Sequence, residues 1–386
     1  MRFLLVILCV TTALYCCADN DMTNRSQLDV ASEKMLGYIN VIPLDSTAIP
    51  RSLEEDGSLI TGNSRQWTSG FFPGTLWQLY SYSQNDSIKK AAEDWTAFIE
   101  KEKYDDHTHD LGFKLNSSFG KAYAITENEA YKNVVITASK TLINRYNENI
   151  GSIRSWDWNA DVWQFPVIID NMMNLEMLFD ATRFTGDSTF HHIATQHALT
   201  TNEHHYRADN SCFHVVDFDT TTFEPRLKTT HQGYSDESAW SRGQAWGLYG
   251  FTVAYGRTGN DIFLDRAKKS AQYIYNHPNL PEDKIPYWDF NAPNIPDEPR
   301  DVSAATVTAS ALLELIRYDQ ENTDWYLSWT DQILESLATD KYQSNIAPFL
   351  LLHSTGSVPG EFEVDQPIVY ADYYYIEALL RRDAIK

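Results

Sequence analysis

The chain has 386 residues, and its acidic side chains outnumber the basic ones to give a formal net charge of −22 at pH 7. Binding to nucleic acid needs a basic face, so this charge argues against a nucleic-acid partner, and it would also repel a polyanionic sugar at long range. The sequence contains 11 Trp, 22 Tyr and 18 Phe. Most of these rings are expected in the core, and the remainder could form stacking surfaces for sugar rings.

Residues 1–18 contain one basic residue, an apolar run and then small residues. This pattern predicts a secretory signal, which is too short to span a bilayer as a mature helix. Cleavage after Ala18 would leave a single exported domain over 19–386, periplasmic in a bacterial envelope. The alternative is a lipid-anchored N-terminus at Cys16 or Cys17. The signal leaves Cys212 as the remaining cysteine, so no internal disulfide framework is expected.

A repeat of helix pairs runs along the rest of the chain. The first helix of each pair is rich in Gly, Ala and aromatic residues and is apolar on most faces, whereas the second has ordinary amphipathic spacing. The expected pairs, first helix before second, are 70–83 with 87–98, 119–126 with 129–143, 165–184 with 188–199, 241–257 with 261–276, 303–318 with 324–337, and 370–382 with the N-terminal stretch 27–41.

Helices that are apolar all round are buried, and amphipathic helices cover them. Six such pairs that close N- to C-terminus predict an all-α (α/α)6 toroid with an inner and an outer ring. An open solenoid is the alternative, but it needs polar capping repeats, and the aromatic helix 370–382 is a poor cap. Loops rich in Pro, Gly and Trp lead into the inner helices, so they should build a pocket at one end.

The segment 165–184 contains one carboxylate, Asp170, near the start of an apolar helix that we expect to begin at Pro166. Tryptophans crowd the sequence just upstream, at Trp156, Trp158 and Trp163. Apolar surroundings disfavour the charged form of a carboxyl group and raise its pKa toward neutrality, which suits a general acid. The alternative is that Asp170 simply caps the helix.

Four segments at the entrances of inner helices combine polar and aromatic groups. They are 65–74, 107–113, 155–158 with 170–171, and 231–247. Each has a purely structural explanation: Arg242 and Trp246, four residues apart, could be a cation–π pair. Because the segments recur at the same point of the repeat, a shared pocket explains them better together. The His and Cys spacing shows no structural zinc pattern.

Four motifs resemble glycoside hydrolase family 88, the unsaturated glucuronyl hydrolases. They are Trp-Thr-Ser-Gly-Phe-Phe-Pro-Gly at 67–74, His-Asp-Leu-Gly-Phe at 109–113, Ile-Asp-Asn-Met-Met-Asn-Leu at 169–175, and Ser-Arg-Gly-Gln-Ala-Trp-Gly at 241–247. The resemblance covers nearly the whole mature chain, and the motifs follow the family's order. The related unsaturated rhamnogalacturonyl hydrolases of family 105 share the toroid, but these motifs are closer to family 88.

The resemblance implies the same toroid and a particular reaction. The substrate would be an oligosaccharide made by a polysaccharide lyase, with a C4=C5 double bond in its non-reducing-end uronate. Protonation of C4 and addition of water at C5 give a hemiketal. The hemiketal opens, and the next sugar is expelled as the C1 hemiacetal collapses. The glycosidic bond is not attacked directly, so the carboxylate-spacing rule for ordinary glycosidases does not apply.

The resemblance also implies roles for individual residues. Asp170 matches the general acid/base, and Asp110 matches a second essential carboxylate. The residues that match substrate contacts are His109, Gln232, Arg242 and Trp246, with Trp67, Trp156 and His214. We expect Arg242 to bind the uronate carboxylate through its planar fork. No metal or organic cofactor is implied.

One departure concerns sulfated substrates. Some family members recognise them through a Ser-x-x-Ser-x-Lys run, and Pro359 stands here where that lysine would be, after Ser354 and Ser357. The identity of the glycan therefore stays open. Two rivals stay open as well: an ordinary inverting (α/α)6 glycosidase with carboxyls about 6.5–9.5 Å apart in a long cleft, and a non-catalytic glycan-binding lipoprotein. Asp110 and Asp170 lying together deep in one pocket would favour the family 88 reaction.

Overall fold

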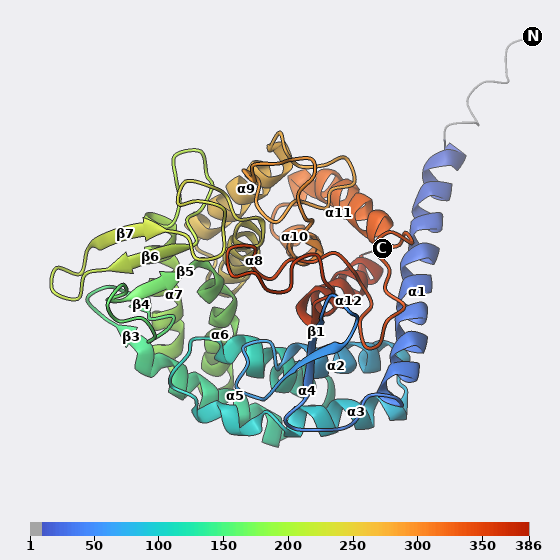
Figure 1. The fold of residues 1–386 in the computed structure, drawn as a ribbon, viewed down its shortest axis with the longest axis horizontal. Helices are drawn as coiled ribbons and strands as arrows, with labels where there is room; N and C mark the ends of the chain where they lie inside the picture. Colours follow the sequence, from blue (N-terminus) through green and yellow to red (C-terminus); the bar gives the residue numbers. More distant parts are fainter. Residues whose placement is uncertain (1–9, 386) are drawn as a thin grey trace, which may run out of the picture.

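The computed structural model describes residues 10–385, and their side chains from Arg25 onward. Its helices form two concentric rings (Figure 1). The inner ring consists of α2 (Phe71–Ser83), η2 (Gly112–Gly120) continued by α4 (Lys121–Thr126), η4 (Ile169–Asn174) continued by α6 (Leu175–Thr185), α8 (Ser241–Thr258), α10 (Val302–Leu315) and α12 (Val369–Ala384). Their outer partners, in the same order, are α3 (Asp86–Ala97), α5 (Glu129–Leu142), α7 (Ser188–His204), α9 (Asp261–Asn276), α11 (Thr323–Leu337) and α1 (Val10–Ile39). Because α12 packs against both α2 and α10, the ring closes, which confirms the predicted (α/α)6 toroid.

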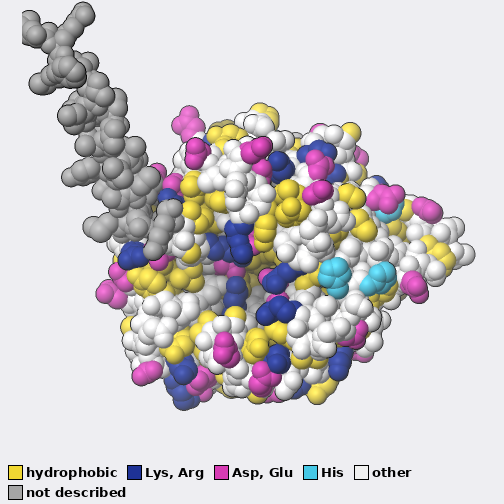
Figure 2. Space-filling model, turned by 180° about the vertical axis from the view of Figure 1, so that it is seen from behind, with side chains coloured by type: hydrophobic (Ala, Val, Ile, Leu, Met, Phe, Trp, Pro, Cys, Tyr) yellow, Lys and Arg dark blue, Asp and Glu magenta, His cyan; other side chains and the backbone are white. Residues whose placement is uncertain are grey.

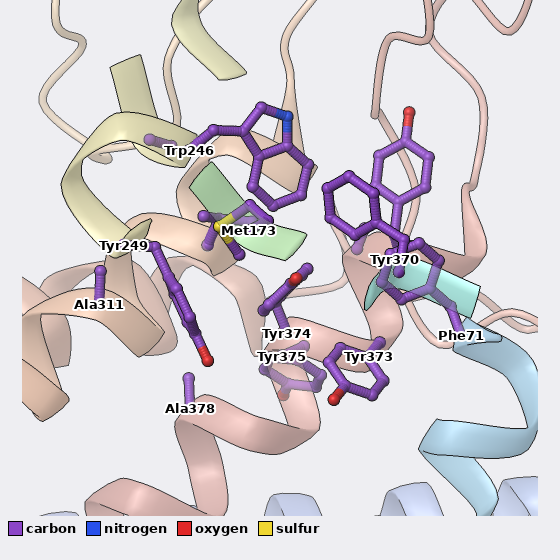
Figure 3. Close-up of a cluster of buried hydrophobic side chains, with 14 of the residues drawn as sticks. Phe71, Met173, Trp246, Tyr249, Ala311, Tyr370, Tyr373, Tyr374, Tyr375 and Ala378 are labelled. Carbon is purple, nitrogen blue, oxygen red and sulfur yellow. The ribbon is translucent and has the colours of Figure 1, made fainter. Parts of the chain in front are cut away.

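The two rings differ in burial as their sequences predict. In α8 every side chain from Ser241 to Ala254 is buried, whereas α9 buries one stripe that includes Phe263, Ala267 and Ile274. Aromatic side chains from α2, α8 and α12 fill the middle of the ring (Figure 3). They are Phe71, Trp246, Tyr249, Tyr370, Tyr373 and Tyr374.

A two-residue turn recurs where the chain passes from an inner helix to its outer partner. The first residue adopts a left-handed conformation, as Gly186 and Gly259 do. The second is an Asp or Asn whose side chain accepts a backbone N–H of the next helix, as Asp187 and Asn260 do. The Thr-Gly-Asp and Thr-Gly-Asn sequences therefore set the alternation between the rings.

Short strands and 3-10 turns occupy the connections that lead into the inner helices. They form two hairpins, β1 (Ile49–Leu53) with β2 (Leu59–Gly62) and β3 (Tyr146–Asn147) with β4 (Ser152–Ile153), and a sheet of β5 (Pro166–Ile168), β6 (Val215–Phe218) and β7 (Pro225–Thr229). Among the 3-10 turns, η5 (Gln320–Asn322) instead joins α10 to its outer partner α11, whereas η1 (Glu100–Tyr104) and η3 (Ile143–Arg145) lie in connections that lead into inner helices. These connections lie at the entrance end of the inner helices.

Two predicted inner helices begin elsewhere than expected. The helix expected at Pro166 is wrong over its first residues, because Pro166–Ile168 is β5, which pairs antiparallel with β6. A run of Val and Ile packs well on a pleated sheet, so the helix starts only at Ile169. The helix expected at 119 starts earlier, at Gly112, as a π-helical stretch. Its wider turns do not follow the 3.6-residue period that the prediction assumed.

The predicted signal over 1–18 falls partly outside the described residues, and its cleavage stays a prediction. Its later part belongs to the long helix α1. No helix in the described part of the chain is long and apolar enough to cross a membrane. Cys212 is buried and unpaired.

Candidate active site

A cavity of about 290 Å³ opens at the end of the toroid where the loops enter the inner helices. Five of these entrances contribute to it, which confirms the prediction of a shared pocket. The lining residues are Trp67, His107, Thr108, His109, Asp110, Phe113, Ser155, Trp156, Trp158, Ile168, Asp170, His231, Gln232, Arg242, Gly356, Phe362, Glu363 and Tyr370. Seven of the nine predicted site residues are among them, and the other two, His214 and Trp246, are not.

Asp170 lies in the first turn of η4, where the chain leaves β5. Its side chain makes no capping bond to that helix, so the capping alternative is wrong. The residue is 8% exposed, and its Oδ2 has no hydrogen-bond partner among the described residues. Burial is the main reason that the pKa of Asp170 rises to about 6, and the Asp110 carboxylate adds a smaller upward contribution. A carboxyl group of this kind can hold and release a proton near neutral pH.

His214 stands behind Asp170. Its Nδ1 accepts the backbone N–H groups of His231 and Gln232, at 3.0 and 3.2 Å. Burial lowers the pKa of His214 well below its usual range, so the ring is neutral and carries its proton on Nε2. That nitrogen lies 3.6 Å from Asp170 Oδ2. The expectation that His214 contacts the substrate is therefore revised, because it approaches the carboxyl group from outside the cavity.

Asp110 is held in its ionised form on another wall. Its Oδ2 accepts a 2.6 Å bond from the Thr108 hydroxyl, and its Oδ1 lies 3.2 Å from His109 Nε2. Burial opposes ionisation, but the charge of His109 and these two contacts outweigh it and lower the pKa of Asp110. His109 donates its backbone N–H to Ser155, which ties this loop to the one that carries Trp156. The cavity thus contains one carboxyl poised to be protonated and one poised to be charged.

Among the described residues that line the cavity, Arg242 is the only one that is a lysine or an arginine. Its Nη1 forms a 2.7 Å ion pair with the buried Asp301 and also donates to the Thr355 carbonyl, and its Nη2 donates to Gly356 at 2.6 Å. The fork predicted to bind the uronate carboxylate is therefore partly occupied by the protein. Nε and one hydrogen of Nη2 are left for a ligand.

The structure separates the predicted tryptophans into two groups. Trp67 and Trp156 line the cavity, as expected. Trp246 does not line it. Its side chain is fully buried near Tyr374 (Figure 3), with ring centroids 5.5 Å apart, and its ring lies 5.2 Å from that of Phe113. Trp246 is therefore not part of the cavity lining in this structure, and its contact with the substrate stays a prediction.

The alternative explanation, a cation–π pair of Arg242 with Trp246, is wrong, since the Arg242 guanidinium lies over Trp240 and Tyr370, at 4.6 and 5.3 Å.

Sequence reasoning missed Phe362, Glu363 and Tyr370. They lie at the entrance of the sixth inner helix, α12, and the position in the repeat was a signal that could have found them. Among the described residues, no group of three or more His, Cys, Asp or Glu side chains could hold a metal ion.

A closed helical toroid with a cavity at one end, which holds two carboxyls of different pKa, defines a carbohydrate-active hydrolase of the (α/α)6 class. The model of Glycosyl Hydrolase Family 88 matches residues 47–281. The chain belongs to glycoside hydrolase family 88.

Relatives and solved structures agree with this assignment. The unsaturated glucuronyl hydrolase of Formosa agariphila is 46% identical over 92% of this chain and 89% of its own length. An unsaturated chondroitin disaccharide hydrolase of Streptococcus agalactiae is 34% identical over 83% of this chain and 82% of its own. The crystal structure of an unsaturated glucuronyl hydrolase specific for heparin superposes with a TM-score of 0.90 at 40% identity, over 95% of this chain and 98% of that one.

Proposed function

We propose that the protein hydrolyses lyase-generated glycosaminoglycan-type oligosaccharides and releases the 4,5-unsaturated uronic acid from their non-reducing end. The observation that carries this proposal is Asp170, a buried carboxyl with a pKa of about 6 in a cavity that also holds the ionised Asp110. The cavity is small and lies at one end of the ring, which fits a single terminal sugar better than the long cleft of an ordinary inverting glycosidase.

The chemistry follows from the two protonation states. Asp170 gives its proton to C4 of the unsaturated ring, and the positive charge that develops at C5 resembles an oxocarbenium ion. A water molecule adds to C5 and returns a proton to the Asp170 carboxylate, so the catalyst is regenerated. The hemiketal then opens, and the C1 hemiacetal collapses to expel the next sugar.

The surrounding side chains position these steps. The Nε2–H of His214 faces Asp170 Oδ2, so it supports the carboxylate after the proton leaves and keeps that oxygen oriented. Asp110 accepts hydrogen bonds from ring hydroxyls, and Trp67 and Trp156 offer stacking faces. Arg242 places a positive charge near the uronate carboxylate through the donors that Asp301, Thr355 and Gly356 leave over. His109 and Gln232 add polar contacts.

The sequence supports two further proposals, one on sulfation of the substrate and one on the location of the protein. Pro359 supplies no charge where some family members have a lysine, and Arg242, which Asp301 already pairs, is the one basic Lys or Arg lining the described cavity. We therefore propose a substrate without 6-sulfation on the leaving-group sugar, the ring attached to C1 of the unsaturated uronate. The signal pattern over 1–18 supports export, to the periplasm or to a lipid anchor at Cys16 or Cys17.

The test is the loss of the ultraviolet absorbance of the unsaturated uronate over a panel of lyase-generated disaccharides, with saturated analogues as controls. The rate should fall as pH rises through about 6, because Asp170 then loses the proton it must donate. Hydrolysis of a saturated analogue at a comparable rate would identify an ordinary glycosidase instead. Binding of the panel without turnover would identify a glycan-binding protein.

A further inference from the structure

The rim of the cavity carries aromatic side chains that the proposed chemistry does not use. Phe362 is 43% exposed and Trp158 is 47% exposed, whereas Phe113 and Tyr370, on the same cavity wall, are almost fully buried. Trp158 is stacked on Trp156, with ring centroids 4.8 Å apart. Phe362 has no aromatic neighbour of this kind among the described residues, so its exposed face is open to a ligand.

The backbone holds Phe362 in a defined place. Its N–H donates to the Ser357 carbonyl at 3.2 Å, and its own carbonyl accepts the Ser357 N–H at 3.1 Å. The residues on either side, Glu361 and Glu363, have φ angles of 54° and 51°. A left-handed conformation at a residue other than glycine is strained, and it persists only where the surroundings impose it.

The side chain of Phe362 is fixed as well. A Cβ at Gly360 would lie 2.6 Å from Phe362 Cε1, so glycine at 360 leaves the space that the ring occupies. The Arg51 guanidinium lies over the ring, 5.8 Å from its centroid. Arg51 is itself held by Glu363 and Gln66. One face of Phe362 is thus supported by a neutralised charge pair.

We propose that Phe362 determines specificity by stacking against the leaving-group sugar, the ring attached to C1 of the unsaturated uronate. This inference rests on the proposed function. The reacting ring must lie deep, beside Asp170, so the next ring lies at the rim. A phenyl ring has no hydrogen-bond donor or acceptor, and therefore recognises the apolar C–H face of a sugar and not its hydroxyl pattern or charge.

The experiment compares two substrates that share the reacting ring. One is an unsaturated disaccharide, and the other is the methyl glycoside of the same unsaturated uronate, which has no second ring. Phe362→Ala should lower kcat/KM for the disaccharide roughly tenfold, in the range of one aromatic stacking contact. It should change kcat/KM for the methyl glycoside by less than about twofold.

Two further variants keep the result interpretable. Phe362→Tyr keeps the ring and should retain the wild-type preference for the disaccharide. Gly360→Ala should displace the ring and reproduce the selective loss without removing it. Thermal melting of each variant checks that the fold is intact, and the exposure of Phe362 predicts little change.

Several outcomes would overturn the inference. An equal loss on both substrates would mean that Phe362 only supports the loop carrying Gly356, and no loss on either would mean that it does not touch the substrate. A wild-type protein inactive on both substrates would instead refute the proposed function itself.

Discussion

The toroid buries a carboxyl group toward each end, and the two differ in their hydrogen-bond partners and in the direction of their pKa shifts. Asp170 lies at the entrance end with one oxygen unpartnered, and burial raises its pKa to about 6. Glu377 lies in the second half of α12, toward the opposite end, and is 4% exposed. The face opposite to that in Figure 1 shows Lys and Arg side chains gathered around a central hollow (Figure 2).

Glu377 is satisfied from several helices. It accepts hydrogen bonds from Lys121 at 2.7 Å, Tyr249 at 2.9 Å and Ser310 at 2.7 Å, and Arg381 lies 3.5 Å away. Burial opposes its ionisation, but the charges of Arg381 and Lys121 and the hydrogen bonds outweigh it and lower its pKa to about 2.

Burial alone therefore does not make a carboxyl group reactive. At Glu377 both carboxylate oxygens accept hydrogen bonds, which join α4, α8 and α10 to α12, and the group serves the fold. At Asp170 the fold leaves an acceptor empty, so the substrate can use it. The difference lies in the partners and can be tested by removing each carboxylate in turn.

Asp170→Asn should produce the largest effect. The substitution keeps the size of the side chain but removes the transferable proton, so turnover on an unsaturated disaccharide should fall about 10²–10⁴-fold. Binding of the substrate, measured by calorimetry, should persist. Turnover within a few-fold of the wild type would exclude Asp170 as the acid.

Glu377→Gln should affect stability instead. Removing the Glu377 charge takes from Lys121 and Arg381 the carboxylate that they share in a buried network, at a cost of about 3 kcal/mol in the free energy of unfolding. Denaturant unfolding at pH 7 measures it, while kcat at low temperature should stay close to the wild-type value.

The drop in the free energy of unfolding that Glu377→Gln causes should also depend on pH in a defined direction. The pKa of Glu377 is lowered from 4.5 to about 2, so its stabilisation is present above pH 4.5 and disappears as pH falls toward 2. A gap between variant and wild type that does not narrow below pH 4.5 would contradict this account.

Asp170→Asn should give the smallest effect, a gain in stability. The pKa of Asp170 is raised from 3.8 to about 6, so the native state is penalised as pH rises through that interval. Above pH 6 the amide variant should be more stable by about 1–3 kcal/mol. Below pH 3.8 the two proteins should unfold alike. A variant less stable than the wild type at pH 8 would show that the carboxylate is satisfied in a way the structure does not reveal.

The sequence was sufficient for the ring architecture because the signals are local. Helical periodicity separates buried from amphipathic helices, and Asp187 and Asn260 mark where each outer helix begins. It failed at Pro166–Ile168, because a short apolar run has the same pattern in a strand as in a helix. The partner that decides between them, Val215–Phe218, lies far along the chain.

The site was predicted less completely for the same reason. Asp170, Asp110 and His109 stand in motifs at helix entrances, so their position in the repeat located them. Trp246 shares the motif of Arg242 but lies one turn deeper, and a motif does not encode depth. Phe362 lies in no motif, and its exposure depends on Gly360 and on Arg51, whose ion-pair partner Glu363 lies 312 positions later in the chain.

The contact between Arg51 and Glu363 has a consequence for folding kinetics. It joins β1 to the loop before α12, while α12 itself closes the ring against α2. Contacts between segments so distant in sequence pay a large loop-closure entropy before they are rewarded, so they form late. Neighbouring helix pairs can assemble early from local contacts. The walls of the cavity include Gly356 and Tyr370. The cavity therefore forms only in the final step of folding, and partly folded chains would be inactive.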